Sequence, residues 1–201
     1  MKVVLLVLVA TAPCLSQSTW SGLQFGMTAE QARVVLKGRS IKDRLEPASR
    51  AGNADLPEMF FIDVDGVTVG PHKGAAHLLF DKDRKLVQVS LLFERNEPEG
   101  RACRFQGITA QEAATRSSMV VDISEKMIER FGKPTTETGT FPTIEELNAF
   151  FAHGIVTGFA QIGRGRRVWI TEGQAIEESF LLPCGDLLLS IIYKPQTKDE
   201  L

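Results

Sequence analysis

Apolar and polar residues follow a period of two over much of the chain between residues 58 and 94, which is the pattern of β-strands. The alternating stretches are 58–64, 67–70, 75–80 and 86–94. Asp65 and Gly66 predict a tight turn between the first two stretches, and the polar residues 81–85 predict a hairpin turn between the last two. In 86–94 the apolar side chains share one face, so we expect a sheet with one buried face and one wet face.

A period near 3.6 replaces this pattern in the segment that precedes the strands, where "GLQFGMTAEQARVVL" has the start signals of a helix. Thr28 is placed to cap the helix, and Gln31 lies three residues later, as a reciprocal capping box requires. Val34 and Val35 are expected on the buried side, with Ala32 and Leu36 as further candidates, and Gly38 ends a helix of about ten residues. The polar segment 39–57 that follows predicts no more than a short turn near residues 41–45.

The same order returns in the second half of the chain. "GITAQEA" at 107–113 echoes "GMTAEQA" at 26–32, with Thr109 and Glu112 as a second capping box. The helix that follows runs to Phe131, where Gly132 stops it. Its apolar face consists of Val120, Ile123, Met127 and Phe131. A small helix at 143–151 and a meander of three strands then follow; the strands are 166–171, 175–182 and 187–194.

These patterns predict an α+β fold with two helix-then-antiparallel-sheet units in tandem, the helices packed on one face of the sheet. We divide the chain into a signal peptide (1–18), a first unit (19–96) and a second unit (97–201), with the charged linker "RNEPEG" at the boundary. An echo of seven residues is consistent with a tandem repeat, and also with independent use of the same helix-start device.

The helix start at Gly26–Gln31 and the hairpin "HLLFDKDRKLVQVSLLF" resemble the small outer-membrane lipoproteins of the β-barrel assembly machinery. The doubled layout is similar to that of β-lactamase inhibitor protein. The Gly-x-Pro that ends the first helix in the lipoprotein family is missing after Gly38 and occurs instead at Gly132–Pro134. The resemblance implies an envelope protein that binds other proteins, but its motifs belong to the scaffold and bear on fold more than on function.

Composition narrows the class of partner. With 43% hydrophobic and 24% charged residues the chain is expected to fold, and a formal net charge of −2 gives no positive surplus for binding nucleic acid. Residues 1–18 place Lys2 before an apolar run, 3–10, which is too short to cross a bilayer but fits a signal peptide. We therefore expect a periplasmic or secreted protein without a transmembrane segment. The alternative is that Cys14 carries a lipid and is not removed with the signal peptide.

Removal of the first 18 residues leaves two cysteines, Cys103 and Cys184. An oxidising compartment favours a disulfide between them, and closing a loop of about 80 residues contributes about 4 kcal/mol; two buried thiols are the alternative. The last four residues, Lys198, Asp199, Glu200 and Leu201, spell the retrieval signal of the endoplasmic reticulum, which makes the lumen of that organelle the alternative location if the source is a eukaryote.

Catalytic chemistry is sparse in this sequence. His72, His77 and His153 lack metal-ligand spacing, "DVDG" at 63–66 fits a hairpin turn better than a calcium loop, and no nucleophile motif occurs. We expect no catalytic residue, metal or cofactor. One candidate contact for a partner or an anion remains, in a loop that ends a hairpin: Arg164, Arg166, Arg167 and Trp169.

The leading hypothesis is an exported, non-catalytic protein-binding or envelope-associated module whose partner is another protein in the envelope or extracellular space. The alternatives are a small-molecule or lipid binder, a hydrolytic enzyme of an unrecognised type, and a resident of the endoplasmic reticulum. The sequence leaves the oligomeric state and the identity of the partner open.

Overall fold

The computed structural model describes residues 19–46, 59–93, 109–153, 164–181 and 188–196. The elements, in chain order, are α1 (Ala29–Val35), β1 (Ile41–Glu46), β2 (Met59–Val69), β3 (His72–Phe80), β4 (Leu86–Phe93), α2 (Ala110–Phe131), β5 (Thr136–Gly139), α3 (Ile144–His153), β6 (Arg164–Thr171), β7 (Gln174–Leu181) and β8 (Leu188–Pro195). The predicted signal peptide, the 96/97 boundary, both candidate disulfide cysteines (Cys103 and Cys184) and the last four residues lie outside the described ranges.

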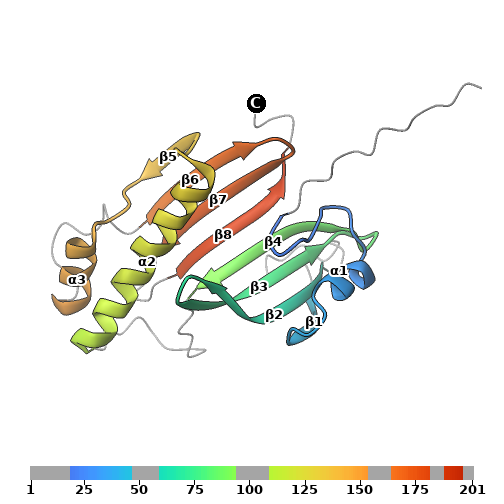
Figure 1. Cartoon of the computed structure of the whole chain (residues 1–201), viewed down its shortest axis with the longest axis horizontal. Helices are drawn as coiled ribbons and strands as arrows, with labels where there is room; N and C mark the ends of the chain where they lie inside the picture. The colour runs from blue at the N-terminus through green and yellow to red at the C-terminus, as the bar shows by residue number, and fades with distance from the viewer. Residues whose placement is uncertain (1–18, 47–58, 94–108, 154–163, 182–187, 197–201) are drawn as a thin grey trace, which may run out of the picture.

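The described strands form one antiparallel sheet of eight strands in the order β1-β2-β3-β4-β8-β7-β6-β5 (Figure 1). The prediction of two helix-then-sheet units in tandem is therefore wrong. Strands β4 and β8, far apart in sequence, pair along five register positions from Val89↔Tyr193 to Phe93↔Leu189. Each would otherwise leave an edge of unpaired backbone groups beside an apolar face, and pairing removes both edges at once.

Two further strand predictions are wrong for local reasons. Asp65 and Gly66 do not turn the chain: β2 continues through them with a register shift, and Gly66 (φ 70°) accommodates this bulge. The hairpin turn lies instead at Gly70, between β2 and β3. The segment 41–46, expected to hold only a short turn, is the edge strand β1, which pairs with β2 from Ile41↔Val64 to Glu46↔Met59.

The helix starts are confirmed. Thr28 accepts from the backbone N–H of Gln31, whose side chain accepts from the backbone N–H of Thr28, and Thr109 and Glu112 repeat the arrangement. The hairpin β3–β4, the meander β6–β7–β8 and the end of α2 at Gly132 are also as predicted.

The buried side of α1 agrees with the prediction only in part. Val34 and Val35 are 75% and 37% exposed, whereas the further candidates Ala32 and Leu36 are buried, together with Ala29. A helical period fits either set, and the side that packs on the sheet is the one with two small residues. In α2 the expected apolar residues Val120, Ile123 and Met127 are buried.

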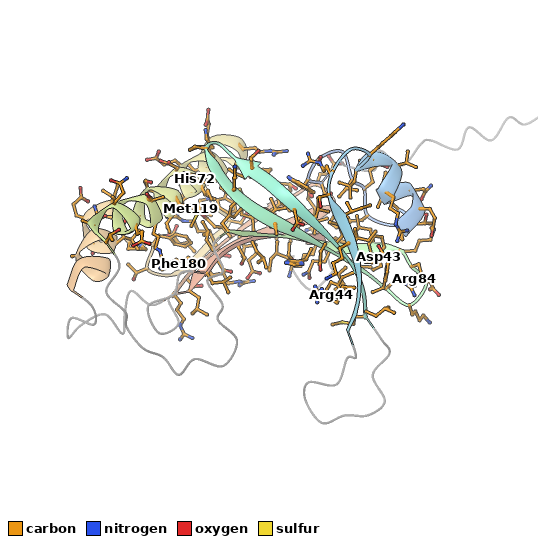
Figure 2. The ribbon with its side chains drawn as sticks, turned by 90° about the horizontal axis from the view of Figure 1, so that it is seen from below. Asp43, Arg44, His72, Arg84, Met119 and Phe180 are labelled. Carbon is orange, nitrogen blue, oxygen red and sulfur yellow. The ribbon has the colours of Figure 1, made fainter. Side chains whose placement is uncertain are left out.

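The two sheet faces differ because side chains alternate along each strand and register partners share a face. One face carries most of the core and packs under α1 and α2, which both lie on the same side of the sheet (Figure 2). We call it the covered face. Its largest buried side chains include Phe80, Phe93, Phe180, Trp169, Leu78, Leu91 and Ile62. The opposite face, which we call the open face, is not overlaid by any described helix.

Candidate functional site

The open face is traversed by a row of side chains that crosses all eight described strands. Register pairs connect each member to the next, from the edge strand β1 to the edge strand β5. In order, the row consists of Lys42, Asp63, His77, Ser90, Ile192, Glu177, Val168 and Thr136. Polar and ionisable groups from segments more than 100 residues apart thus lie in one line on a surface that the described helices leave open.

At one end of this row, three side chains from β1, β2 and β3 form a hydrogen-bonded cluster. Arg44 donates from Nε to Asp63 Oδ2 at 2.8 Å and from Nη2 to Asp63 Oδ1 at 3.2 Å. His77 Nδ1 lies 2.5 Å from Asp63 Oδ1. All three side chains are half-buried. The guanidinium of Arg44 also stacks 4.4 Å from the ring centroid of Phe61, so it is held by two kinds of contact.

The hydrogen bonds decide the charge state of this cluster. Partial burial by itself raises the pKa of Asp63, but the hydrogen bonds from Arg44 and His77 outweigh it and hold the pKa of that carboxyl below its ordinary value. An ionised Asp63 only accepts hydrogen bonds, so the imidazole donates from Nδ1–H. The 3.4 Å approach of Arg44 Nη2 to the same nitrogen is then a contact between two donors, and is not a hydrogen bond.

The order Asp63, His77, Ser90 across three adjacent strands invites comparison with a catalytic triad. Such a triad needs the nucleophile hydroxyl within hydrogen-bond reach of the imidazole. The Ser90 hydroxyl instead accepts from Nε2 of Gln88 at 2.8 Å, on its own strand. The arrangement therefore presents a positioned carboxylate and imidazole but lacks the base–nucleophile hydrogen bond of acyl transfer.

The other half of the open face carries a second set of polar contacts. Arg166 on β6 donates to Glu177 on β7 at 2.8 Å, and the hydroxyls of Ser179 and Ser190 lie 2.8 Å apart. Half-buried apolar side chains separate these groups from the first cluster, among them Ile192 in the row. The open face thus combines ion pairs, hydroxyls and apolar side chains, whereas the covered face is mainly apolar.

The residues singled out from the sequence, Arg164, Arg166, Arg167 and Trp169, lie on strand β6 and not in a loop. Arg167 and Trp169 belong to the covered face, where Arg167 pairs with Glu137 at 3.0 Å and the Trp169 indole donates to the Gly132 carbonyl at 2.8 Å. Arg166 belongs to the open face. Alternation along the strand separates the set, so the four residues do not form one binding site.

The cluster of Arg44, Asp63 and His77 was missed from the sequence. The sequence pattern places Arg44 in a polar turn segment and Asp63 next to a turn, and it marks His77 only as a histidine without metal spacing. The available signal was the alternation in "IKDRLE", where Arg44 follows Lys42 by two residues. In the described part of the chain no group of three or more His, Cys, Asp or Glu side chains is arranged to hold a metal ion.

Comparison of the chain with protein-family models, with curated proteins and with solved structures finds no match. Among the described helices, none combines the length and apolar character needed to cross a membrane. The resemblance to assembly-machinery lipoproteins thus stays a prediction from sequence motifs.

Proposed function

We propose that this chain is an exported, non-catalytic protein-binding module whose open face contacts another protein in the envelope or the extracellular space. The observation that supports this most directly is the combination of residues on that face. Arg44 is stacked on Phe61 and fixed by Asp63. Leu79, the register partner of Phe61 on β3, adds a half-buried apolar side chain beside them. Arginine and aromatic side chains held in this way are typical of the residues that dominate protein–protein binding energies.

Pre-organisation supports the same proposal. A long side chain that is ordered only on binding loses about 0.5–1.5 kcal/mol of conformational free energy. Arg44 already has two hydrogen bonds and a ring contact within the described structure, so its side chain would lose little further conformational free energy when a partner binds. The export part of the proposal rests on the signal-peptide pattern of residues 1–18.

Site-specific photo-crosslinking tests the open face. A photoreactive amino acid replaces Ser90, near the middle of the face, and in a control protein it replaces Ile128, which is 40% exposed on the outer side of α2. Each protein is irradiated in an envelope extract and in culture fluid. We expect a discrete adduct with a second protein from position 90 and none from position 128. No adduct at either position, or the same adduct at both, would overturn the proposal.

A pair of arginine substitutions refines the test. Arg44→Ala removes the stacked guanidinium from the open face, and Arg130→Ala removes a comparable guanidinium, 5.1 Å from the ring of Phe131, from the helix side. We expect Arg44→Ala to lower the adduct yield at least tenfold, which corresponds to a loss of about 1.4 kcal/mol in binding. Arg130→Ala should leave the yield unchanged. Circular dichroism of both variants checks that they fold.

A further inference from the structure

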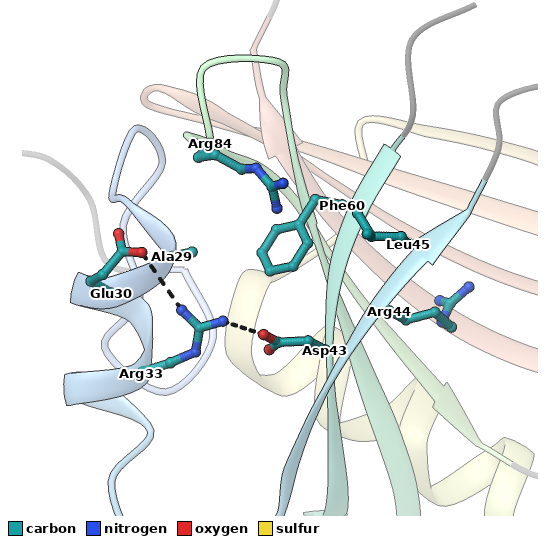
Figure 3. A pocket seen from close by; sticks show the side chains of 8 residues that line it. All are labelled: Ala29, Glu30, Arg33, Asp43, Arg44, Leu45, Phe60 and Arg84. Atoms are coloured by element: carbon teal, nitrogen blue, oxygen red, sulfur yellow. Dashed lines mark hydrogen bonds and ion pairs between the residues drawn. The ribbon is translucent and has the colours of Figure 1, made fainter.

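A pocket of about 410 Å³ lies between α1 and the edge strand β1, on the covered side of the sheet (Figure 3). Its walls come from the helix, from β1 and β2, and from the turn between β3 and β4. The lining residues are Ala29, Glu30, Arg33, Asp43, Arg44, Leu45, Phe60 and Arg84. The side chain of Arg44 points away from the pocket toward the open face, so the pocket is a separate site (Figure 3).

The two arginine side chains that face the pocket differ in how their charge is balanced. Arg33 is paired with Asp43 at 2.6 Å and with Glu30 at 3.8 Å. Arg84 lies 4.0 Å from the ring centroid of Phe60, and no ion pair joins it to a carboxylate of the described residues. Its charge reaches only Glu30, where it is the smallest of the causes that lower the pKa of that carboxyl. A guanidinium stacked on a ring keeps its in-plane N–H donors available. Arg84 therefore offers a positioned site for a carboxylate.

The backbone at Arg84 is unusual for a residue of this type. Its φ is +57°, in the left-handed region where glycine and asparagine are favoured. This conformation in the hairpin turn directs the arginine side chain over Phe60 and into the pocket (Figure 3). Residues in such conformations are frequent at ligand-binding sites, where surrounding contacts maintain them.

Beside the pocket runs the outer edge of the sheet. Among the strands that the structure describes, β1 pairs only with β2, so alternate residues of β1 point their backbone N–H and C=O groups away from the sheet. Leu45, near the end of β1, is 56% exposed. Met59 on β2, the register partner of Glu46, is 37% exposed. An extended chain that pairs with this edge would place every second side chain on the pocket side.

We propose that the groove between α1 and β1 binds an extended, acidic segment of a partner protein, which adds to β1 as a ninth strand and places a carboxylate on Arg84. A small free anion suits this pocket less well, because Glu30 and Asp43 stand in the same pocket and offset the positive charge of Arg33. A peptide gains main-chain hydrogen bonds along β1 in addition to the contact with Arg84. The groove and the open face lie on different sides of the sheet, so binding at one does not require binding at the other.

Fluorescence anisotropy with labelled peptides and the full chain tests the proposal. The probe is a blocked nonapeptide in which Thr alternates with Glu and Leu, so that the acidic and apolar side chains share one side of an extended strand. The control peptide has Gln in place of Glu. We expect the acidic peptide to bind at least tenfold more tightly than the control, and Arg84→Gln to abolish that difference.

Two controls distinguish strand addition at β1 and a carboxylate on Arg84 from a general attraction between opposite charges. Lys82→Gln removes a positive charge from the same turn without touching the pocket lining, and should change affinity less than twofold. Methylation of alternate backbone amides in the peptide, in two complementary sets, should abolish binding for only one set. Equal loss for both sets, displacement of the peptide by millimolar phosphate, an equal effect of Lys82→Gln, or no binding of any peptide would overturn the proposal.

Discussion

The pairing of β4 with β8 makes the sheet continuous, and substitution of Leu91 tests how much stability resides there. Leu91 and its register partner Ile191 on β8 are each 1% exposed, on the covered face. Leu91→Ala removes three carbon atoms; at about 0.8 kcal/mol for each buried methylene this costs about 2.4 kcal/mol. The cavity left behind adds to that loss, so we expect unfolding free energy to fall by about 3 kcal/mol.

The two tryptophans allow both ends of the sheet to be followed in urea. Trp20 precedes α1, and Trp169 lies on β6, so variants retaining one or the other report on different halves of the structure. In a single cooperative sheet, Leu91→Ala shifts both fluorescence transitions to lower urea by the same amount, about 1–1.5 M for m near 2–3 kcal/mol/M. Val34→Ala, at an exposed position, should change stability by no more than about 0.5 kcal/mol.

Two outcomes would refute these expectations. If only the Trp20 signal moves, the first four strands unfold independently of the rest, and the contact across β4 and β8 contributes little. A loss below about 1 kcal/mol would show that the site collapses around the smaller side chain without a cavity. The double variant with Ile191→Ala measures the contact directly, because residues that touch are expected to deviate from additivity.

Three further predictions concern two carboxylates and a helix cap. Burial raises the pKa of Glu178 despite the contacts from Ser124 and Arg167, so the native state binds its proton more tightly than the unfolded chain. The unfolding free energy of the wild type then falls as pH rises from the ordinary pKa of a glutamate toward the raised pKa of Glu178 in the folded state. Glu178→Gln should remove that fall in thermal melts at pH 4–7. The pKa of Asp63 is lowered in the folded state, so the stability that this carboxylate contributes is present above the ordinary aspartate pKa of about 3.9 and is lost as pH falls through the folded-state pKa. Asp63→Asn should remove this loss of stability at acid pH in urea titrations at pH 2–5. Thr109→Ala should cost about 1 kcal/mol of unfolding free energy, and Thr109→Ser should restore most of it.

Elements specified by local chemistry were predictable from the sequence. The capping pair of Thr109 with Glu112 satisfies backbone donors within one turn, and Gly132 ends α2 with a positive φ. The pairing of β4 with β8 was not predictable in the same way, because the two edges are brought together by tertiary structure and neither strand alone indicates its partner. The buried side of α1 is a similar case. The helical period permits Val34 on either the buried or the exposed side, and packing against the sheet determines which side is buried.

The candidate site was harder to predict than the fold. Arg166 and Arg167 are adjacent in sequence, and adjacency suggested one charged surface, but neighbouring strand residues point to opposite faces. Asp63 and His77 are 14 residues apart and meet because the register of β2 and β3 places them opposite each other. Clusters of this kind depend on register, which the hydrophobic alternation and the turns and bulges of both strands set together.

The polar contacts beneath α2 indicate how the covered side supports the open face. Glu178 is fully buried beneath α2, where it accepts from Ser124 at 2.5 Å, and His72 on β3 lies 2.7 Å from Asp122 on the same helix. These polar contacts fix the helix along the sheet, since hydrogen bonds constrain direction more than apolar packing does. A sheet braced from one side keeps its register, and the spacing of Asp63 and its partners on the other side depends on that register. If the open face binds a protein as proposed, this bracing lowers the conformational free energy lost on binding, so that more of the buried area is converted into affinity.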